Sequence, residues 1–598
     1  MNAPENVNKK ISKKVPDGQL TVTTSACPEC RKTVPAKVLV RNNKVYFEKS
    51  CVEHGVSTVL VADEADQYLD AFNFHRKATV PLAFKRPFTG LCPESCGFCP
   101  EHEQHVCMPV VEITDHCDMA CPVCLVRNHQ RWHMTLDEFK KILDRLIETE
   151  ESIDVLNLSG GEPTLHPQFT EFIEEILRRK EILRASVSTN GLRLQQDANL
   201  LRFLAERNVV ISLQYDGDNP ESVERLRGRN TTEIKNSLIQ QICEMNASCS
   251  LTFTLTPDVN EAFLESAIEL LFTKPNILSL MVQPVAYCGT GSTFNVKGSG
   301  KDNRKARGVG GASENVSTSV GASAGVNAIT GSNANTNTNT NTNTNTNTNT
   351  NTNTNTNTNT NTNTCSGANA NTSLSANVNA GASASVNVNA SDKGERRKIF
   401  IPEVTRLVEK YSKNRVKAND FSPLPCSHPG CFSLSFFLKV GEGEYLSIKH
   451  FFEPETYLNI IKNRALFGTD PDNFQKIEEA VYQLWSGPCA LAPDSERALK
   501  AVKTLLKKAQ GTAASMARPA ASPKPSSSMQ VSKSGGDSCF NPATAINAAE
   551  RDIKSIFIHG FMDPDTFDLS RARKCCQVYP LRDGRFMPIC VYNVLERK

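Results

Sequence analysis

The strongest constraint on the fold is a regular alternation between residues 108 and 286, where short β-branched segments alternate with longer amphipathic ones. We expect the strands at 109–114, 155–159, 184–189, 209–215, 248–256 and 277–283. We expect the helices near 136–148, 169–179, 198–207, 232–244 and 261–272. Such alternation predicts a parallel sheet with right-handed crossovers. Six units are too few for a closed eightfold barrel, so the pattern predicts an α/β fold with a partial (β/α)6 barrel.

The composition narrows the class of protein. The chain has 598 residues, too many for one ordinary core, and its formal net charge of +3 gives no reason to expect nucleic-acid binding. The N-terminus is polar and basic, and no apolar segment approaches the ~18 residues that span a bilayer. We therefore expect a cytoplasmic protein. Because thiols stay reduced there, clusters among the 21 cysteines predict metal sites rather than disulfides.

Two segments of low complexity divide the chain. Residues 291–392 are rich in Asn, Thr, Ser, Ala and Gly, and residues 511–542 are rich in Ala, Ser, Pro and Lys. Neither buries enough apolar surface to offset the entropy of ordering, so we expect both to be disordered. The other boundaries follow, with an N-terminal metal module at 1–80, an auxiliary cluster segment at 81–107, the barrel at 108–290, and a C-terminal region at 393–510 and 543–598. Cys365 and Cys539 lie in the two low-complexity segments and receive no role.

The N-terminal module contains two metal-binding knuckles. Cys27 and Cys30 precede a β-hairpin that turns at residues 41–43, and Cys51 and His54 follow it. This C-x2-C…C-x2-H spacing beside Pro and Gly is typical of a tetrahedral site for one zinc or iron ion. It predicts a rubredoxin-like or zinc-ribbon-like module, and the choice of metal stays open.

A cysteine triplet follows the first expected barrel strand. Cys117, Cys121 and Cys124 have C-x3-C-x2-C spacing, which fits three corners of a [4Fe–4S] cluster and leaves the fourth iron free. Polar or Gly-rich sequences then end the next three strands. The candidate binding residues at these ends are Gly160, Gly161, Glu162, Pro163, Thr189, Asn190, Ser212 and Gln214. Arg227, a little further on, is a candidate partner for a carboxylate.

This combination resembles the radical S-adenosylmethionine (radical SAM) superfamily. The resemblance implies that SAM chelates the free iron of the Cys117 cluster and that Gly160-Gly161-Glu162 receives its methionine ammonium group. It also implies that Thr189 and Asn190 bind the ribose or the methionine carboxylate. One departure is Val123, because most of the superfamily has an aromatic residue just before the third cysteine.

Two further cysteine sets predict auxiliary clusters. Cys92, Cys96 and Cys99 repeat the C-x3-C-x2-C spacing, and Cys107 offers a fourth ligand, which would close the site. We therefore assign these four to an auxiliary [4Fe–4S] cluster, and His102 is a weaker candidate ligand. The second set, which is scattered along the C-terminal region, comprises Cys426, Cys431, Cys575 and Cys590, with Cys576 as a neighbour. We expect Cys243, Cys249 and Cys489 in the core and leave Cys288 undecided.

The whole pattern resembles archaeal radical SAM tetraether lipid synthases, a group also described as pterin methyltransferases. The likeness rests on the motifs above together with Pro425–Cys431, Phe561–Asp563 and Cys590–Asn593. It implies that the chain couples isoprenoid termini of archaeal diether lipids by C–C bond formation. The alternative is C-methylation of a dihydropterin, and a third possibility is a multicluster electron carrier. The resemblance further implies a reducing partner such as ferredoxin or flavodoxin, and peripheral contact with a membrane.

Overall fold

The computed structural model describes residues 15–77, 79, 81–84, 92–93, 96–127, 131–150, 152–295, 396–462, 484–485, 489, 494–516 and 550–597. All of them fall in one compact unit, formed by residues 1–300 and 394–598.

Most of the two low-complexity segments lies outside the described residues, so their disorder stays a prediction. The start of the second is corrected, because α12 (Ser495–Met516) continues through the first six residues of the expected linker. Alanine favours this continuation of the helix.

The N-terminal module is a four-stranded antiparallel sheet. Its strands β1 (Gly18–Ala26), β2 (Thr33–Arg41), β3 (Lys44–Cys51) and β4 (Gly55–Ala62) pair in chain order. Alternate residues of β2 and β3 point inward, so Val38, Val40, Val45 and Phe47 form a small core beside α1 (Ala65–Asp70). A core of this size needs a metal ion as reinforcement.

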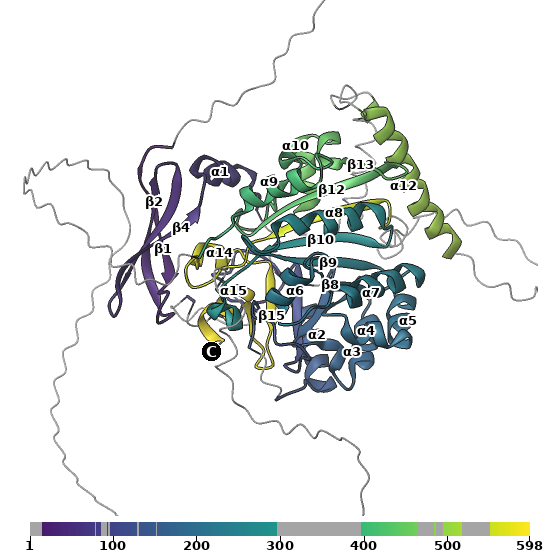
Figure 1. Ribbon diagram of the computed structural model, residues 1–598, viewed down its shortest axis with the longest axis horizontal. Coiled ribbons are helices and arrows are strands. Elements are labelled where there is room, and N and C mark those ends of the chain that lie inside the picture. The colour runs from purple at the N-terminus through teal and green to yellow at the C-terminus, as the bar shows by residue number, and fades with distance from the viewer. Residues whose placement is uncertain are drawn as a thin grey trace, which may run out of the picture. The chain divides into compact units, whose positions relative to one another are not determined.

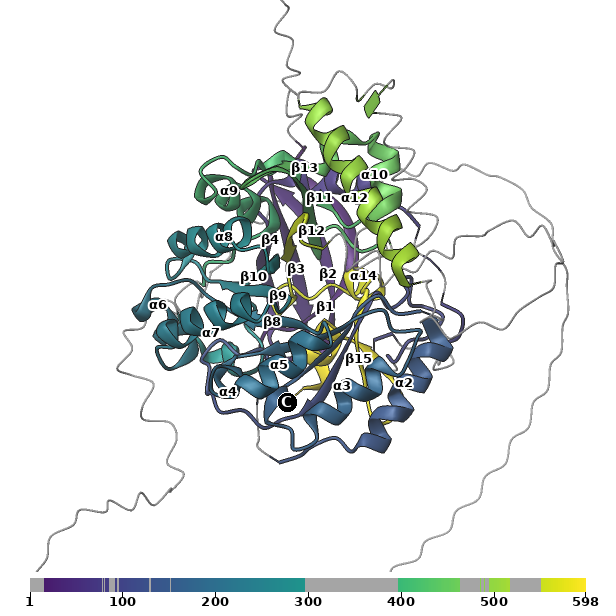
Figure 2. The same cartoon turned by 90° about the vertical axis from the view of Figure 1, so that its right-hand side faces the viewer.

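The barrel has the expected strands. These are β5 (Met108–Thr114), β6 (Leu156–Gly160), β7 (Ala185–Thr189), β8 (Val210–Gln214), β9 (Cys249–Leu255) and β10 (Ile277–Pro284). All six lie parallel in this order. Helices on the outer side of these strands are visible in both views (Figures 1 and 2). They include α2 (Leu136–Glu150), α3 (Phe169–Leu177), α5 (Ala198–Glu206), α6 (Pro220–Arg227), α7 (Thr232–Glu244) and α8 (Leu264–Thr273).

The C-terminal region extends this sheet at both edges, which the sequence did not predict. The strand β14 (Ile553–His559) lies parallel to β10, and β15 (Gln577–Pro580) lies parallel to β5. Beyond β14, the strand β12 (Phe432–Gly441) is antiparallel, and α12 packs on it. The C-terminal strand β15 is therefore brought directly beside the first barrel strand, β5.

The N-terminal sheet is held against the C-terminal region by polar contacts. The Lys49 ammonium group is buried and donates to the carbonyl oxygens of Pro564 (2.8 Å) and Asp565 (2.6 Å). On β1, the Thr23 hydroxyl donates to Asp568 Oδ1 (2.6 Å) and Ser25 to the Phe567 carbonyl (2.5 Å). Burial lowers the pKa of Lys49 to about 8, and the nearby carboxylates of Asp563 and Asp565 oppose this shift. Lys49 therefore stays charged at neutral pH, and the carbonyl groups accept its hydrogen bonds.

Candidate functional site

The Cys117 triplet lies in the loop after β5, at the carboxyl end of the sheet where parallel barrels carry their reactive groups. Burial raises the pKa of the Cys117 thiol to about 12 and that of Cys124 to about 11. Without metal these thiols stay protonated at neutral pH, so cluster binding must displace their protons. The loop therefore presents partly buried thiols that a cluster can bind.

The backbone of the Gly160–Glu162 segment holds this loop in place. Gly161 N donates to the Thr114 carbonyl at 2.8 Å, and Glu162 N donates to the His116 carbonyl at 2.6 Å. A Cβ atom on Gly160 would lie 2.1 Å from the Thr114 oxygen, and one on Gly161 would lie 2.1 Å from the His116 oxygen. Both glycines are thus required because the backbone of the cluster loop approaches them closely.

Replacing Gly161 with alanine is expected to push the cluster loop away from β6. Overpacking of this kind costs about 1–3 kcal/mol, and here the colliding atom is a backbone carbonyl that cannot rotate away. The variant should lose iron from the Cys117 site, measured as iron and sulfide per chain after reconstitution. The matched control is Gly441→Ala, whose new Cβ meets only the flexible Glu444 carboxylate. Full iron content in Gly161→Ala would contradict the assignment.

Glu162 has a role that the sequence did not predict. Its carboxylate is fully buried and accepts hydrogen bonds from Thr164 Oγ1 (2.6 Å), Thr189 Oγ1 (2.7 Å) and Asn190 N (2.7 Å). The side chain therefore ties the end of β6 to the end of β7. The expectation that Glu162 also supplies charge to a methionine ammonium group stays a prediction. Pro163 starts the short helix η2 (Pro163–Leu165) directly after it.

Asn190 connects the end of β7 to the cluster loop. Its Nδ2 donates to Asp118 Oδ1 at 2.6 Å, and its Oδ1 accepts from Leu192 N at 2.9 Å. Thr189 accepts from Gly191 N while it donates to Glu162. The two predicted ligand-binding side chains of β7 are thus engaged within the protein, and Asn190 lies next to the cysteine triplet.

At the end of β8, the sequence prediction missed a buried lysine. Lys235 of α7 donates to the Asn190 carbonyl, to the Gln214 carbonyl (2.6 Å) and to Gln214 Oε1 (3.1 Å). Burial lowers its pKa to about 8. It joins the ends of β7 and β8 beneath the cluster loop. Ser212, two residues before Gln214 on the same strand, forms a hydrogen bond between its Oγ and Thr252 Oγ1 at 3.2 Å. The only signal for Lys235 was a lysine on an otherwise apolar helix face.

Arg227 does pair with a carboxylate, and that carboxylate belongs to the protein. Its Nε lies 2.5 Å from Asp216 Oδ2 and its Nη2 lies 3.0 Å from Asp216 Oδ1. The guanidinium also hydrogen-bonds the Cys121 sulfur. Burial opposes the charge, but Asp216 and Cys121 more than offset it and raise the pKa of Arg227. A permanent positive charge therefore lies beside the middle cysteine of the triplet.

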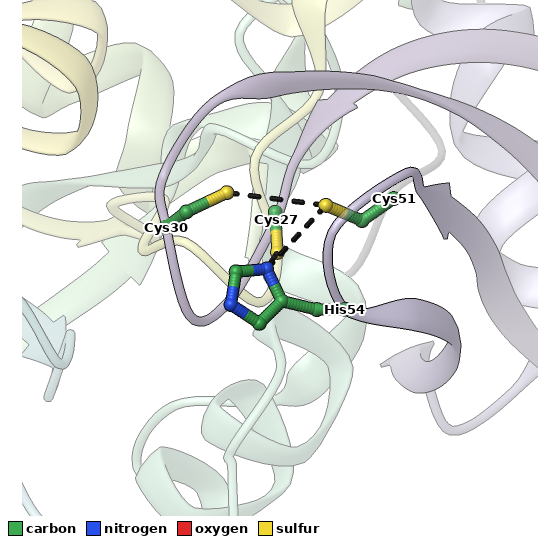
Figure 3. Close-up of side chains that lie close together, drawn as sticks. All are labelled: Cys27, Cys30, Cys51 and His54. Atoms are coloured by element: carbon green, nitrogen blue, oxygen red, sulfur yellow. Dashed lines mark hydrogen bonds between the residues drawn. The ribbon is translucent and has the colours of Figure 1, made fainter.

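The N-terminal module brings its four predicted ligands together (Figure 3). The ligand atoms of Cys27, Cys30, Cys51 and His54 all lie within 4.8 Å of one another. His54 Nδ1 is 3.5 Å from Cys51 Sγ and 3.6 Å from Cys27 Sγ. The hydrogen bond from His54 lowers the pKa of Cys51 to about 6, so this ligand is a thiolate at neutral pH. Three sulfurs and one imidazole nitrogen at this spacing fit one tetrahedral ion.

Removing one ligand tests this site. The Cys51→Ser variant is expected to bind one metal equivalent per chain less than the wild type, because a serine hydroxyl is a poor ligand at neutral pH. Elemental analysis of zinc and iron measures the loss and identifies the ion. The Cys243→Ser variant, which changes a half-buried cysteine outside every group described here, should keep the full complement. Equal metal content in both variants would rule out the proposed site.

Among the upstream cysteines, the structure separates Cys107 from the other three. Cys92, Cys96 and Cys99 line one pocket together with Arg573. The Cys107 sulfur instead contacts Cys426 and Cys576. The reason is the pairing of β5 with β15, which places Met108 opposite Gln577 and lets Cys107 N donate to the Cys576 carbonyl at 3.0 Å. The assignment of Cys107 to the upstream site stays a prediction, and Cys426 and Cys576 are alternative partners for it.

The C-terminal cysteines lie in two adjoining sets. Cys431, Cys575 and Cys590 act electrostatically on one another, and Cys426 lies near Cys107 and Cys576. Cys431 and Cys575 also act on Cys576, so the single C-terminal site stays a prediction. Below, the upstream triplet means Cys92, Cys96 and Cys99, and the C-terminal triplet means Cys431, Cys575 and Cys590. Cys249 and Cys489 are buried as expected, and Cys243 is partly buried. Cys288 is buried at the end of β10, with its sulfur 3.6 Å from the Met562 carbonyl.

Comparisons with known proteins agree with this arrangement. Residues 111–271 match the radical SAM superfamily, and residues 19–63 match the domain described as "HMPTM N-terminal zinc ribbon domain". A relative from Methanocaldococcus jannaschii, "7,8-dihydro-6-hydroxymethylpterin dimethyltransferase", is 27% identical over 275 residues, or 45% of this chain and 53% of the relative. A "GTP 3',8-cyclase" from Haemophilus ducreyi is 26% identical over 23% of this chain and 41% of its own length. The chain thus spans about half the length of these relatives or less.

The similar solved structures include Streptococcus suis SuiB bound to precursor peptide SuiA, at 14% identity and a TM-score of 0.28 over 31% of this chain and 40% of that one. At this score the likeness carries no weight for function. The family matches and the site geometry together show a domain of the radical SAM superfamily at residues 111–271, preceded by a zinc ribbon at residues 19–63. Within the described residues, no helix is long and apolar enough to cross a membrane.

Proposed function

We propose that this radical SAM enzyme adds a methyl group to a carbon atom of a dihydropterin. The observation that carries the proposal is the shared arrangement of zinc ribbon and barrel. The ribbon matches the domain described as "HMPTM N-terminal zinc ribbon domain", and the M. jannaschii relative is described as a dihydropterin dimethyltransferase. This reading replaces lipid coupling, the main expectation from the sequence, as the first candidate.

The site residues suit the required cofactors. Cys117, Cys121 and Cys124 would hold three irons of the SAM-binding cluster, which leaves the fourth to SAM. When bound, cluster and SAM supply a radical that takes hydrogen from a carbon no side-chain base can deprotonate. Arg227, whose charge is paired with Asp216, places its guanidinium N–H groups beside Cys121, where they would face a ligand sulfur of the cluster.

The residues at the strand ends support SAM binding indirectly, because they hold the backbone around the cluster loop in place. Glu162, Asn190 and Lys235 lock the ends of β6, β7 and β8 to one another, so the backbone groups that face the cluster loop are fixed before SAM binds. Such preorganisation lowers the entropic cost of binding. Gly160 and Gly161, Pro163, Ser212 and Gln214 remain our candidates for direct SAM contacts in this frame.

Coupling of two diether lipid chains to a tetraether is the second candidate. The observation in its favour is the likeness of the C-terminal motifs, Pro425–Cys431 and Cys590–Asn593, to tetraether lipid synthases. Both reactions form a carbon–carbon bond at a carbon without acidic hydrogens, so the Cys117 site serves either one. The match of residues 111–271 to the radical SAM superfamily favours either enzyme over a pure electron carrier.

Product analysis tests the proposal directly. The fully reconstituted and reduced protein is incubated with SAM and either a dihydropterin or an archaeal diether lipid, and products are identified by mass spectrometry. We expect a methylated pterin, with formation of 5′-deoxyadenosine that depends on the pterin. Deoxyadenosine formed only with the lipid, together with a tetraether product, would overturn the proposal in favour of the second candidate. The Cys121→Ala variant provides the blank.

A further inference from the structure

The short helix α14 (Leu569–Arg573) lies between the two auxiliary cysteine triplets and presents an arginine to each. Arg571 contacts Cys431 of the C-terminal triplet, and Arg573 hydrogen-bonds Cys92 of the upstream triplet. The helix begins at Asp568, which caps it and also accepts from Thr23 of the zinc ribbon. One rigid element thus fixes both arginines relative to both triplets.

Arg571 is a partly buried cation that faces sulfur. Its Nε lies 3.4 Å from Cys431 Sγ, and its Nη2 donates to the Gly560 carbonyl at 2.7 Å. Within the described residues, no carboxylate forms an ion pair with it. Asp568, the acid that acts on it, has its Oδ1 engaged by Thr23 and Ser570. Burial opposes the charge, and Cys431 and Cys590 rank first among the groups that raise the pKa of Arg571.

Arg573 also carries a positive charge, but it is ion-paired and partly exposed to solvent. Its guanidinium pairs with the Glu101 carboxylate at 3.0 Å, and its side chain is 35% exposed. Its Nε is buried and has no hydrogen-bond partner among the described residues, and Arg573 lines the pocket of the upstream triplet. An unpartnered N–H at this position fits an anionic group held by these cysteines. Glu101 and solvent cancel much of the positive charge that such a group would feel.

The reduction potential of an iron–sulfur cluster depends on net charge, on hydrogen bonds to the sulfurs and on solvent exposure. A cation that has no ion-pair partner stabilises the reduced form, which carries one more negative charge, more than a cation that is ion-paired with a carboxylate. We propose that each triplet holds an auxiliary cluster and that α14 keeps the two clusters at unequal potentials, with the cluster at the C-terminal triplet higher than the one at the upstream triplet.

The test is a potentiometric titration of the reconstituted full chain, followed by electron paramagnetic resonance. Signals are assigned with Cys431→Ala, Cys96→Ala and Cys121→Ala, each of which should remove one. The Arg571→Gln variant should lower the midpoint potential of the C-terminal signal, and Arg571→Lys should recover part of the shift because it keeps the charge. Arg582→Gln, the same change at a half-exposed arginine paired with Glu138, should leave all three potentials unchanged.

Glu101→Gln provides an independent variant that leaves both arginines in place. Without this carboxylate, Arg573 is uncompensated, so the potential of the upstream cluster should rise and the gap between the two should narrow. Unchanged potentials in Arg571→Gln and Glu101→Gln, with iron and sulfide content intact, would overturn the proposal. If Arg571→Gln loses its iron, an unchanged upstream potential in Glu101→Gln alone refutes it. Wild-type protein that binds iron only at Cys117 would refute the auxiliary clusters instead, while SAM cleavage would persist.

Discussion

Replacing Cys121 with alanine is expected to abolish SAM cleavage, with 5′-deoxyadenosine falling to the level of a protein-free blank. Three thiolates are the minimum that the Cys117 cluster requires, and Cys121 is the one that Arg227 contacts. The loss should be specific, because the zinc-ribbon ligands and both auxiliary triplets lie in other loops. The measurement is deoxyadenosine by liquid chromatography, together with metal and sulfide per chain.

The matched control is Cys243→Ala, which removes a thiol from helix α7 outside the cysteine groups. It should retain cleavage and metal content. If Cys121→Ala still cleaved SAM, the upstream triplet with the same spacing would become the SAM-binding site. In that event Cys96→Ala would abolish cleavage, so the pair of variants decides between the two triplets.

The Asp216→Asn substitution is expected to destabilise the barrel by about 3–5 kcal/mol, the usual cost of breaking a buried ion pair on one side. Asp216 is completely buried and binds Arg227 through both carboxylate oxygens, and it also accepts from Thr254 N at 2.8 Å. The amide leaves the Arg227 charge without its partner. The free energy of unfolding of the metal-free protein in urea measures the effect.

Two controls separate the buried charge from other causes. In the double variant Asp216→Asn/Arg227→Gln, no unpaired charge remains, so part of the lost stability should return. Asp144→Asn breaks an exposed pair with Arg179 and should change stability by less than about 1 kcal/mol. A cost for Asp216→Asn as small as that for Asp144→Asn would show that Arg227 finds another partner, and SAM binding should then be unaffected.

Much of the barrel was predictable, because the spacing of apolar residues within each segment indicates whether it forms a strand or a helix. The expected helix at 232–244 coincides with α7, and the six strands differ from prediction by no more than one residue at either end. The added strands β14 and β15 were not predictable, since their neighbours lie hundreds of residues away. A short apolar segment carries no information about which distant edge it joins.

In the candidate site, too, local patterns were predictable and long-range contacts were not. The three cysteines of the Cys117 triplet lie close together in the sequence, so their ligand pattern could be recognised from the sequence. The contact of Cys107 with Cys576 arises only through the pairing of β5 with β15, so local spacing could not reveal it. Glu162 was recognised by its motif, but its hydrogen bonds to Thr164, Thr189 and Asn190 depend on where neighbouring strands end.

The contacts of Lys49 have a consequence for biosynthesis. The zinc ribbon leaves the ribosome hundreds of residues before Pro564 and Asp565, the carbonyl partners that bury Lys49. During translation the ribbon therefore has only its own small core and its metal ion for stability, and contacts so distant in sequence form slowly. Until the last segment is made, α14, Cys575 and Cys590 are missing, so the upstream triplet is uncovered and the C-terminal triplet is incomplete. Cluster insertion at the upstream triplet can use that interval, and docking of the ribbon on Asp568 then closes the assembly.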